Sequence, residues 1–401
     1  MKTTQKKTKK TIFLVFEMIL VSFFYYCTKP FDATLDDFED ILVVDAFITS
    51  EIKQQEIKIS RTFLDGEEVN QETGATVAVS DNTGALFIFN EAQPGTYVSE
   101  VPFGAITGLA YTLNIDLTSG TRLQAGPVEI TSEGSLDELL VSKNISETGQ
   151  EGISIAVDGT SGGSSTNFFR YDYVETFEVV SPFSANLDLV VVSEDPPVLG
   201  TIAKTKEERV CYRTQFSNEI TLASSEGISN NRIQGFEIVF IPKNDFSIRN
   251  RYSILVNQYI QSPIANTFYQ NLKDFSNLTT LFSQTQPGFI EGNITSLNNT
   301  NLRILGLFEV ANVSSKRVFI DRADFFPNER EPDFIFECSL LSFPFNSSAL
   351  LRLIQNGSHK YVSEDFIGFP PTTITVFTVV ERGCVDCTSL GTNVVPDFWE
   401  D

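Results

Sequence analysis

The stretch QQEIKISRTF, residues 54–63, alternates between polar and apolar side chains. Ile57 and Ile59 fall on one face of an extended strand, because successive side chains of a strand point to opposite faces. Glu56 and Lys58 fall on the other face. An antiparallel strand with one face in the core and the other in water has this pattern. The stretch therefore predicts a mainly β fold.

Similar short runs of β-branched and aromatic residues recur around this stretch at intervals of about ten residues. They are ILVVDAFIT (41–49), ATVAVSD (75–81), ALFIFNE (85–91), TYVSE (96–100) and YTLNIDL (111–117). Turn-forming pairs such as Asp65-Gly66 and Pro94-Gly95 separate them. This spacing predicts one immunoglobulin-like or transthyretin-like β-sandwich over residues 41–132.

Residues 133–401 predict a larger β-rich domain with one or two short helices and a C-terminal Cys-x-x-Cys tail. NFFRYDYVETFEVV (167–180) predicts a long strand, since it is rich in aromatic and β-branched residues. SEDPPVLGTIAKTKEER (193–209) is charged and contains prolines, so it predicts an exposed loop. IANTFYQNLKDFSNLTTLF (264–282) predicts a helix. Its apolar residues at helical spacing are Ile264, Phe268, Leu272 and Phe275.

Residues 1–26 are typical of an export signal. Five lysines precede an apolar run of 15 residues, Ile12 to Tyr26, which is short for a membrane-spanning helix. A buried helix opening a soluble domain is the alternative interpretation. Cys27 follows the run, as in bacterial lipoprotein signals, although Tyr25 and Tyr26 stand where a small residue is usual. We therefore expect lipidation of Cys27, against an ordinary free thiol, and a protein anchored to a membrane by lipid.

The charge of the chain excludes a nucleic-acid partner. The formal net charge is −23, from 29 basic and 52 acidic residues. Residues 1–26 hold five lysines and one glutamate, so the remaining chain has 24 basic and 51 acidic residues and a net charge of −27. Such a chain repels nucleic acid and anionic lipid headgroups. Within it, residues 27–40 form an acidic segment that we interpret as a solvated tether, with a sorting signal as the alternative.

Four cysteines remain beyond Cys27: Cys211, Cys338, Cys384 and Cys387. The last two form a C-x-x-C, which suits a redox dithiol, half of a zinc site or a structural disulfide. An even number of cysteines in an exported chain favours disulfides, and four allow three pairings. A bond from Cys384 or Cys387 to Cys338 would fix the C-terminal tail to the second domain.

The residues give little support for catalysis. His359 is the only histidine, in a loop-like context after a possible helical turn. No H-E-x-x-H or phosphate-binding glycine motif occurs. A hydrolase with paired carboxylates stays open only because acidic residues are abundant. We expect no enzymatic activity, cofactor or metal.

Aromatic residues are concentrated at the start of the expected long strand. Phe168, Phe169, Tyr171 and Tyr173 alternate with polar residues there. Exposed aromatic side chains stack on sugars or form the centre of interfaces. Buried ones are part of the core, which is the favoured interpretation. The exposed alternative makes these four residues candidates for ligand or partner binding.

Several blocks occur in the order found in one family. They are RYSILVNQYIQSPIANTFYQNLK, LFSQTQPGFIEGNI, LGLFEVANVSSKRVFIDR and CVDCTSLGTNVVPDFW. With Cys27 and the LVVDAFITS opening, they resemble the Bacteroidota lipoprotein family called domain of unknown function 4249. The tail departs from the family pattern at Leu390-Gly391, where a double glycine is usual.

This resemblance implies an outer-membrane lipoprotein, commonly encoded near a TonB-dependent transporter, and gives no catalytic residue. We therefore expect a non-enzymatic outer-membrane lipoprotein that assists such a transporter or captures its substrate. We expect it to face the cell surface, with the periplasmic face as the alternative. The alternative is a stand-alone lipoprotein that binds carbohydrate or peptide at the surface.

Overall fold

A computed structural model describes residues 41–62, 70–162, 167–226, 231–276, 290–370 and 373–400. The fold is mainly β, as predicted, and the described residues other than Thr62 belong to one compact unit. The strands are β1 Leu42–Thr49, β2 Glu56–Arg61, β3 Thr76–Asp81, β4 Leu86–Gln93, β5 Thr96–Ser99, β6 Ala110–Asp116, β7 Arg122–Glu129, β8 Gly134–Ile145, β9 Glu151–Ser161, β10 Phe168–Val180, β11 Leu187–Glu194, β12 Pro197–Ala203, β13 Val210–Phe216, β14 Thr221–Ser224, β15 Arg232–Pro242, β16 Tyr252–Gln261, β17 Ile294–Ser296, β18 Ile304–Ile320, β19 Leu341–Pro344, β20 His359–Ile367 and β21 Ile374–Glu381. The α-helices are α2 Pro263–Ser276, α3 Arg322–Phe325 and α4 Ser348–Gln355.

Strands β1–β7 surround one hydrophobic core, to which β17 and the first half of β18 also contribute. The alternation predicted in β2 is confirmed: Ile57 and Ile59 are fully buried. Lys58 and Glu56 lie on the exposed face, where their charged groups are 2.8 Å apart. The pairing order β1-β2-β5-β4-β3-β6-β7 is antiparallel throughout.

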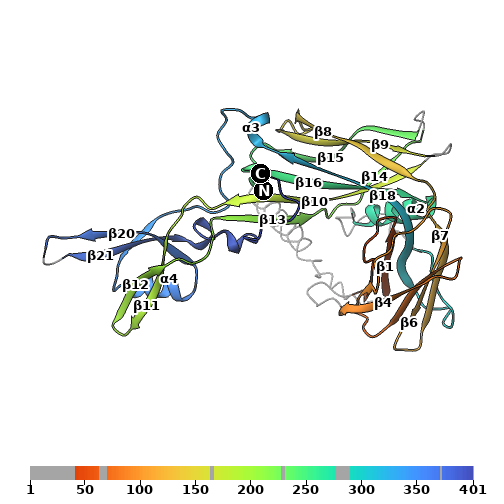
Figure 1. Cartoon of the computed structure of the whole chain (residues 1–401), viewed down its shortest axis with the longest axis horizontal. Helices are drawn as coiled ribbons and strands as arrows, with labels where there is room; N and C mark the ends of the chain where they lie inside the picture. Colours follow the sequence, from red (N-terminus) through yellow and green to blue (C-terminus); the bar gives the residue numbers. More distant parts are fainter. Residues whose placement is uncertain are drawn as a thin grey trace, which may run out of the picture. The chain divides into compact units, whose positions relative to one another are not determined.

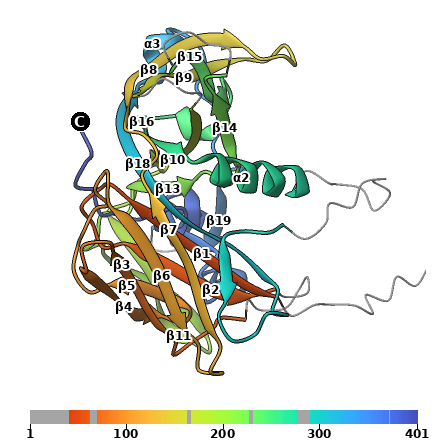
Figure 2. The ribbon, with the colours of Figure 1, turned by 90° about the vertical axis from the view of Figure 1, so that its right-hand side faces the viewer.

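Strand β18 joins this region to the rest of the chain. Its first half pairs in parallel with β1, from Ile304 opposite Leu42 onward. Its second half pairs antiparallel with β16, ending with Ile320 opposite Tyr252. Figure 2 shows β18 running from β1 to β16. One 13-stranded sheet is therefore continuous across residue 132, where the sequence changes character.

The EGNI segment, residues 291–294, holds β18 in place from the side. The Asn293 side chain donates a hydrogen bond to the Phe308 carbonyl and accepts one from the Phe308 amide, each at 2.8 Å. It thereby pairs with the Phe308 backbone as a neighbouring strand would. At Gly292, a Cβ atom would lie 1.5 Å from the Gly306 carbonyl oxygen, so only glycine fits there.

A second core lies between two sheets. The three-stranded sheet β15-β9-β8 lies over β10, β13, β16 and the second half of β18 (Figure 1). Ile155 and Val157 of β9 belong to the same buried cluster as Ile254 and Val256 of β16. Side chains from both sheets thus fill one interior, as in sandwiches.

Helix α2 confirms the predicted helix. Phe268 is buried, and Leu272 packs beside it against Leu307 of β18. Ile264 and Phe275, which share the same helical spacing, are 64% and 52% exposed. The helix lies along the sheet near β10, β16 and β18, so it buries only a narrow strip. The expected residues 277–282 lie outside the described part.

A smaller subdomain is built from β11, β12, β19, β20, β21 and α4, with its own core that includes Leu199, Leu350 and Val379. The exposed loop expected over 193–209 is wrong for its first half, because β11 and β12 form a hairpin there. Leu199 is 3% exposed in the core beside α4, which explains why this segment is ordered into a strand. His359 begins β20 rather than standing in a loop.

Candidate functional site

The four cysteines form two disulfides, and neither disulfide joins the two cysteines of the C-x-x-C. Cys387 bonds to Cys211 of β13, and Cys384 bonds to Cys338 just before β19. The expected bond between the motif and Cys338 is confirmed, and Cys384 is the residue that makes it. Because each cysteine has a different partner, the motif is neither a redox dithiol nor a zinc half-site in this structure. The Cys211–Cys387 bond instead connects the motif to the 13-stranded sheet, and the Cys338–Cys384 bond joins the segments before β19 and after β21.

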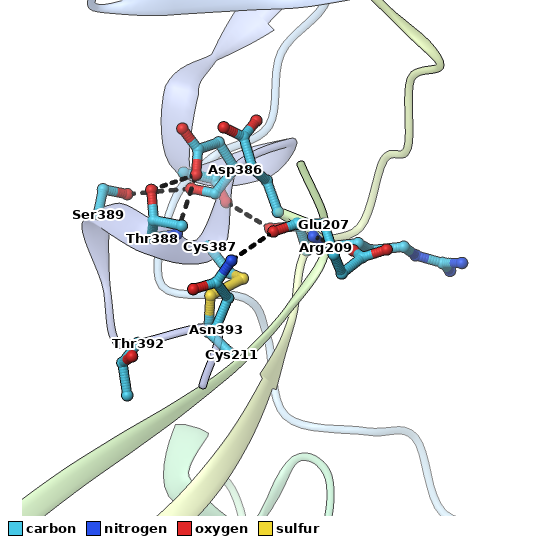
Figure 3. The surroundings of a disulfide bond; sticks show 12 residues. Glu207, Arg209, Cys211, Asp386, Cys387, Thr388, Ser389, Thr392 and Asn393 are labelled. Carbon is cyan, nitrogen blue, oxygen red and sulfur yellow. Dashed lines mark hydrogen bonds between the residues drawn. A yellow bond between two sulfur atoms is a disulfide. The ribbon is translucent and has the colours of Figure 1, made fainter. Parts of the chain in front are cut away.

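The tail after Cys387 runs along β13 (Figure 3). Thr392 exchanges two backbone hydrogen bonds with Tyr212, at 2.7 and 3.0 Å. A Cβ on Gly391 would lie 2.5 Å from the Tyr212 carbonyl oxygen, so this glycine allows the close approach. Trp399 then packs edge-on against the Tyr212 ring, with centroids 4.9 Å apart. The tail is thus held against the sheet at Gly391–Thr392 and again at Trp399.

Asp386, between the two cysteines, is a fully buried carboxylate. Its Oδ1 accepts hydrogen bonds from the Thr388 amide at 3.0 Å and from the Thr388 hydroxyl (Figure 3). Its Oδ2 lies 3.0 Å from Lys360 Nζ and accepts a hydrogen bond from Arg382 Nε at 2.9 Å. Burial raises the pKa of Asp386, but the bonds from Thr388 and Lys360 outweigh it and lower the pKa to about 2.

The two cations that contact Asp386 both lie at the base of the β20–β21 hairpin, one where its first strand begins and one where its second strand ends. Lys360 is the second residue of β20, and Arg382 directly follows β21. Lys360 also lies 2.6 Å from Glu208 Oε2, which in turn lies 3.0 Å from Lys204. Burial lowers the pKa of Lys360, but the hydrogen bonds that Lys360 donates to Glu208 and Asp386 outweigh it and raise that pKa. Charge pairs and disulfides therefore fix the base of the β20–β21 hairpin.

The far end of this hairpin is different. Residues 363–370 are all exposed, and they include Phe366, Ile367 and Phe369 at 68%, 61% and 86% exposure. Ile374, opposite Ile367, is 48% exposed. The sequence predicted only a β-rich domain here and singled out no residue of this surface. The apolar run FIGF, residues 366–369, indicates a strand end but not whether a core or a partner covers it.

The aromatic residues expected as possible ligand contacts lie mostly in the core. Phe169 and Tyr171 are 0% and 1% exposed, and Phe168 and Tyr173 are half-buried. Burial raises the pKa of Tyr171, and its hydroxyl donates to the Gln258 side chain at 3.0 Å. Phe169 and Tyr171 alternate with residues of the opposite face of β10 and point into the second core. They therefore offer no platform to a ligand in solvent.

Arg170, between them, points the other way into a cage of three rings. Its guanidinium carbon lies 4.5–4.6 Å from the ring centroids of Phe47, Tyr259 and Tyr269. Glu309 of β18, which is 3% exposed, approaches Arg170 to 3.6 Å. Burial raises the pKa of Glu309, although Arg170 opposes the shift. Because this group joins β1, β10, β16, β18 and α2, its evident role is to hold these elements together.

Two clefts of the described part are lined mainly by polar and charged residues, and some of these charged groups pair with each other. A cleft of about 550 Å³ near α3 is lined by Arg249, Arg251, Arg322 and Trp399, among others. Arg251 pairs there with Asp321 at 2.5 Å. A cleft of about 670 Å³ beside Glu208 is lined by residues 184–186 and 204–209 with Val385. Within the described ranges, no cluster of three or more His, Cys, Asp or Glu side chains could hold a metal ion.

The expected lipidation site cannot be placed, since Cys27, the export signal and the acidic tether lie outside the described residues. Among the helices that the structure does describe, none has the length and apolar character needed to span a membrane.

Comparison with known families gives one match. The family model described as "Domain of unknown function (DUF4249)" matches residues 28–317, well over half of the chain. The match includes β1–β16, β17 and most of β18, whereas the small subdomain's β19–β21 and three of the disulfide cysteines lie beyond it. Curated proteins give no match. On this evidence the chain belongs to the DUF4249 family.

Proposed function

We propose that this protein is a non-enzymatic lipoprotein of the outer membrane that binds a TonB-dependent transporter as an accessory or substrate-capturing partner. Lipid on Cys27 would anchor it, and residues 27–40 would connect the anchor to the folded part. The Lys-rich, apolar start of the chain followed by Cys27 supports export and lipidation. Two disulfides support an oxidising compartment outside the cytoplasm.

One observation carries the binding role. The β20–β21 hairpin exposes large apolar side chains at its end, while its base is fixed by two disulfides and a buried charge network. A chain that keeps such side chains in water, on a firmly held element, favours docking to another surface. The clefts give less support for a catalytic role than the hairpin gives for binding. Charged groups that line them pair with one another, as Arg251 does with Asp321.

The lipid anchor gives this arrangement a physical advantage. When a protein is tethered to the membrane that contains its partner, the effective concentration of the partner around it is high. Even a weak docking contact would then be occupied most of the time. The net charge of −27 beyond residue 26 keeps the folded part from adhering to anionic headgroups while it is tethered there.

Co-purification tests this proposal. An affinity tag is placed in the exposed turn at residues 147–149, away from the packed tail, and the protein is purified from solubilised outer membranes. We expect a TonB-dependent transporter in the eluate in near-stoichiometric amount. The Cys27→Ser variant, which cannot be lipidated, is the control and should recover much less. A wild-type eluate without any such transporter would contradict the proposal.

A further inference from the structure

The end of the β20–β21 hairpin exposes apolar groups on both of its faces. Phe366 pairs with Thr375, and Ile367 pairs with Ile374. Because neighbouring residues of a strand face opposite sides, Phe366 and Ile367 point away from each other. With 68% and 61% of their surfaces exposed, both faces present apolar side chains to solvent.

This end also has open strand edges. The third strand of the sheet, β19, follows β21 only as far as Pro344 opposite Val376. Beyond that point the described residues form a two-stranded ribbon, and the outer edge of β20 pairs with no described strand. A two-stranded ribbon alone is marginally stable, and an exposed apolar edge invites pairing with other chains. Folded proteins usually block such edges with charge, proline or a covering element.

The base of the hairpin, in contrast, is held in several ways. Asp386 binds Lys360 at the start of β20 and Arg382 at the end of β21. The Cys338–Cys384 disulfide closes the same base, and Cys211–Cys387 connects it to β13 of the large sheet. Because the base is fixed, the exposed end loses less conformational entropy when it binds a partner.

The charge of the hairpin end indicates which kind of surface it can bind. Glu364 and Asp365 are exposed beside the apolar end, and residues 361–370 and 373–381 contain no lysine or arginine. An acidic apolar surface is repelled by anionic membranes, and it is repelled by a second copy of itself. It complements a protein surface on which basic side chains surround an apolar depression.

We propose that residues 363–369 together with Ile374 are a docking element for a protein partner that has an apolar groove rimmed by Lys or Arg. This inference deepens the proposed function. Only the identification of the partner as a transporter rests on the proposed function.

Site-specific photocrosslinking in intact cells tests the contact on the full chain. A photoreactive side chain is placed at Phe366 or Ile367, and at Leu86 of β4 as the control, which is also 61% exposed. We expect the two hairpin positions to crosslink to one and the same protein, and the control position not to do so. A Leu86 yield equal to the hairpin yield would overturn the inference.

The crosslinked protein is then purified and its affinity for the lipid-free chain is measured. Phe366→Asp with Ile367→Asp should weaken binding at least tenfold, whereas Leu86→Asp should leave it unchanged. Glu364→Lys with Asp365→Lys should also weaken binding, and this loss should shrink as salt is raised. Since these positions are exposed, melting temperatures of the variants should match the wild type, which separates lost docking from misfolding. Equal affinity of the hairpin variants and the wild type would overturn the inference.

Two other occupants are outcomes of the same series. Crosslinks only between copies of this chain, or binding of the lipid-free chain to phosphatidylcholine vesicles that is lost in the Phe366 and Ile367 variants, would also overturn it. The proposed function fails separately. If the wild type co-purifies a transporter but the hairpin variants do so equally well, the docking element is wrong and the proposed function stands. If the hairpin partner is not a transporter, the docking element stands and the proposed function fails.

Discussion

Asp386, between the two cysteines of the C-x-x-C, is a buried charge that fixes the residues around it. It is fully buried, yet it contacts two cations and the Thr388 amide and hydroxyl. Asp386→Asn keeps the shape but removes the charge, leaving Lys360 and Arg382 without their shared partner. We expect a loss of about 2–3 kcal/mol in the free energy of unfolding, measured by denaturant titration. Asp333→Asn, which breaks an exposed pair with Arg330, is the control and should cost under about 0.5 kcal/mol.

The same carboxylate makes stability depend on acid pH. Because folding lowers the pKa of Asp386 from 3.8 to about 2, the charged form favours the folded state. This stabilisation is complete above the unfolded-state pKa and disappears as the pH falls through about 2; it amounts to about 2 kcal/mol. The stability difference between wild type and Asp386→Asn should therefore shrink between pH 5 and 2, roughly. A difference that stays constant over this range would contradict the assignment.

Asn293 is the second residue with a large expected effect. Its amide pairs with both backbone groups of Phe308, a residue that is 1% exposed. Asn293→Ala leaves a buried N–H and a buried C=O without partners, which costs about 1–3 kcal/mol each. We expect a loss of at least about 2 kcal/mol in chemical unfolding. Asn298→Ala, at an exposed turn nearby, should cost less, and an equal loss would contradict this role.

Among the elements, the two disulfides carry the most specific prediction. Peptide mapping without reduction should find Cys211 linked to Cys387 and Cys338 linked to Cys384. Replacing either pair by serines should cost about 2–4 kcal/mol, since the unfolded chain gains freedom. Only the Cys338–Cys384 pair closes the hairpin base directly, so its removal should increase hydrogen exchange in β20 and β21 more. A Cys384–Cys387 bond in the map would contradict the structure.

Sequence patterns predicted those elements whose burial follows a simple period. Ile57 and Ile59 of β2 lie inward as the alternation requires, and β10 is the predicted long strand. The patterns failed where tertiary contacts decide. LGLFEVANVSSKRVFI forms one continuous strand in spite of its polar centre, because β16 pairs with the polar residues there. Which cysteine meets Cys338 likewise depends on the fold, so the sequence left both possibilities open.

At the scale of the whole molecule, β18 and the C-terminal tail connect regions of the chain that the sequence predicts to be separate domains. β18 pairs with β1 in one half and with β16 in the other, and Cys387 connects the tail to β13. The exposed hairpin end could not be predicted, because an apolar strand in the sequence looks the same whether a core or a partner covers it. Its charge pattern becomes informative only once the structure places it in solvent.

The proposed function depends most on the lipid anchor, because the anchor brings the protein to a partner in the membrane. The most direct measurement is the mass of the mature N-terminus together with membrane fractionation of wild type and Cys27→Ser. We predict that the wild-type chain begins at a lipid-modified Cys27 and fractionates with the outer membrane, while the variant is recovered without lipid. A wild-type protein that keeps residues 1–26, or that carries an unmodified Cys27 and stays in the soluble fraction, would contradict the account.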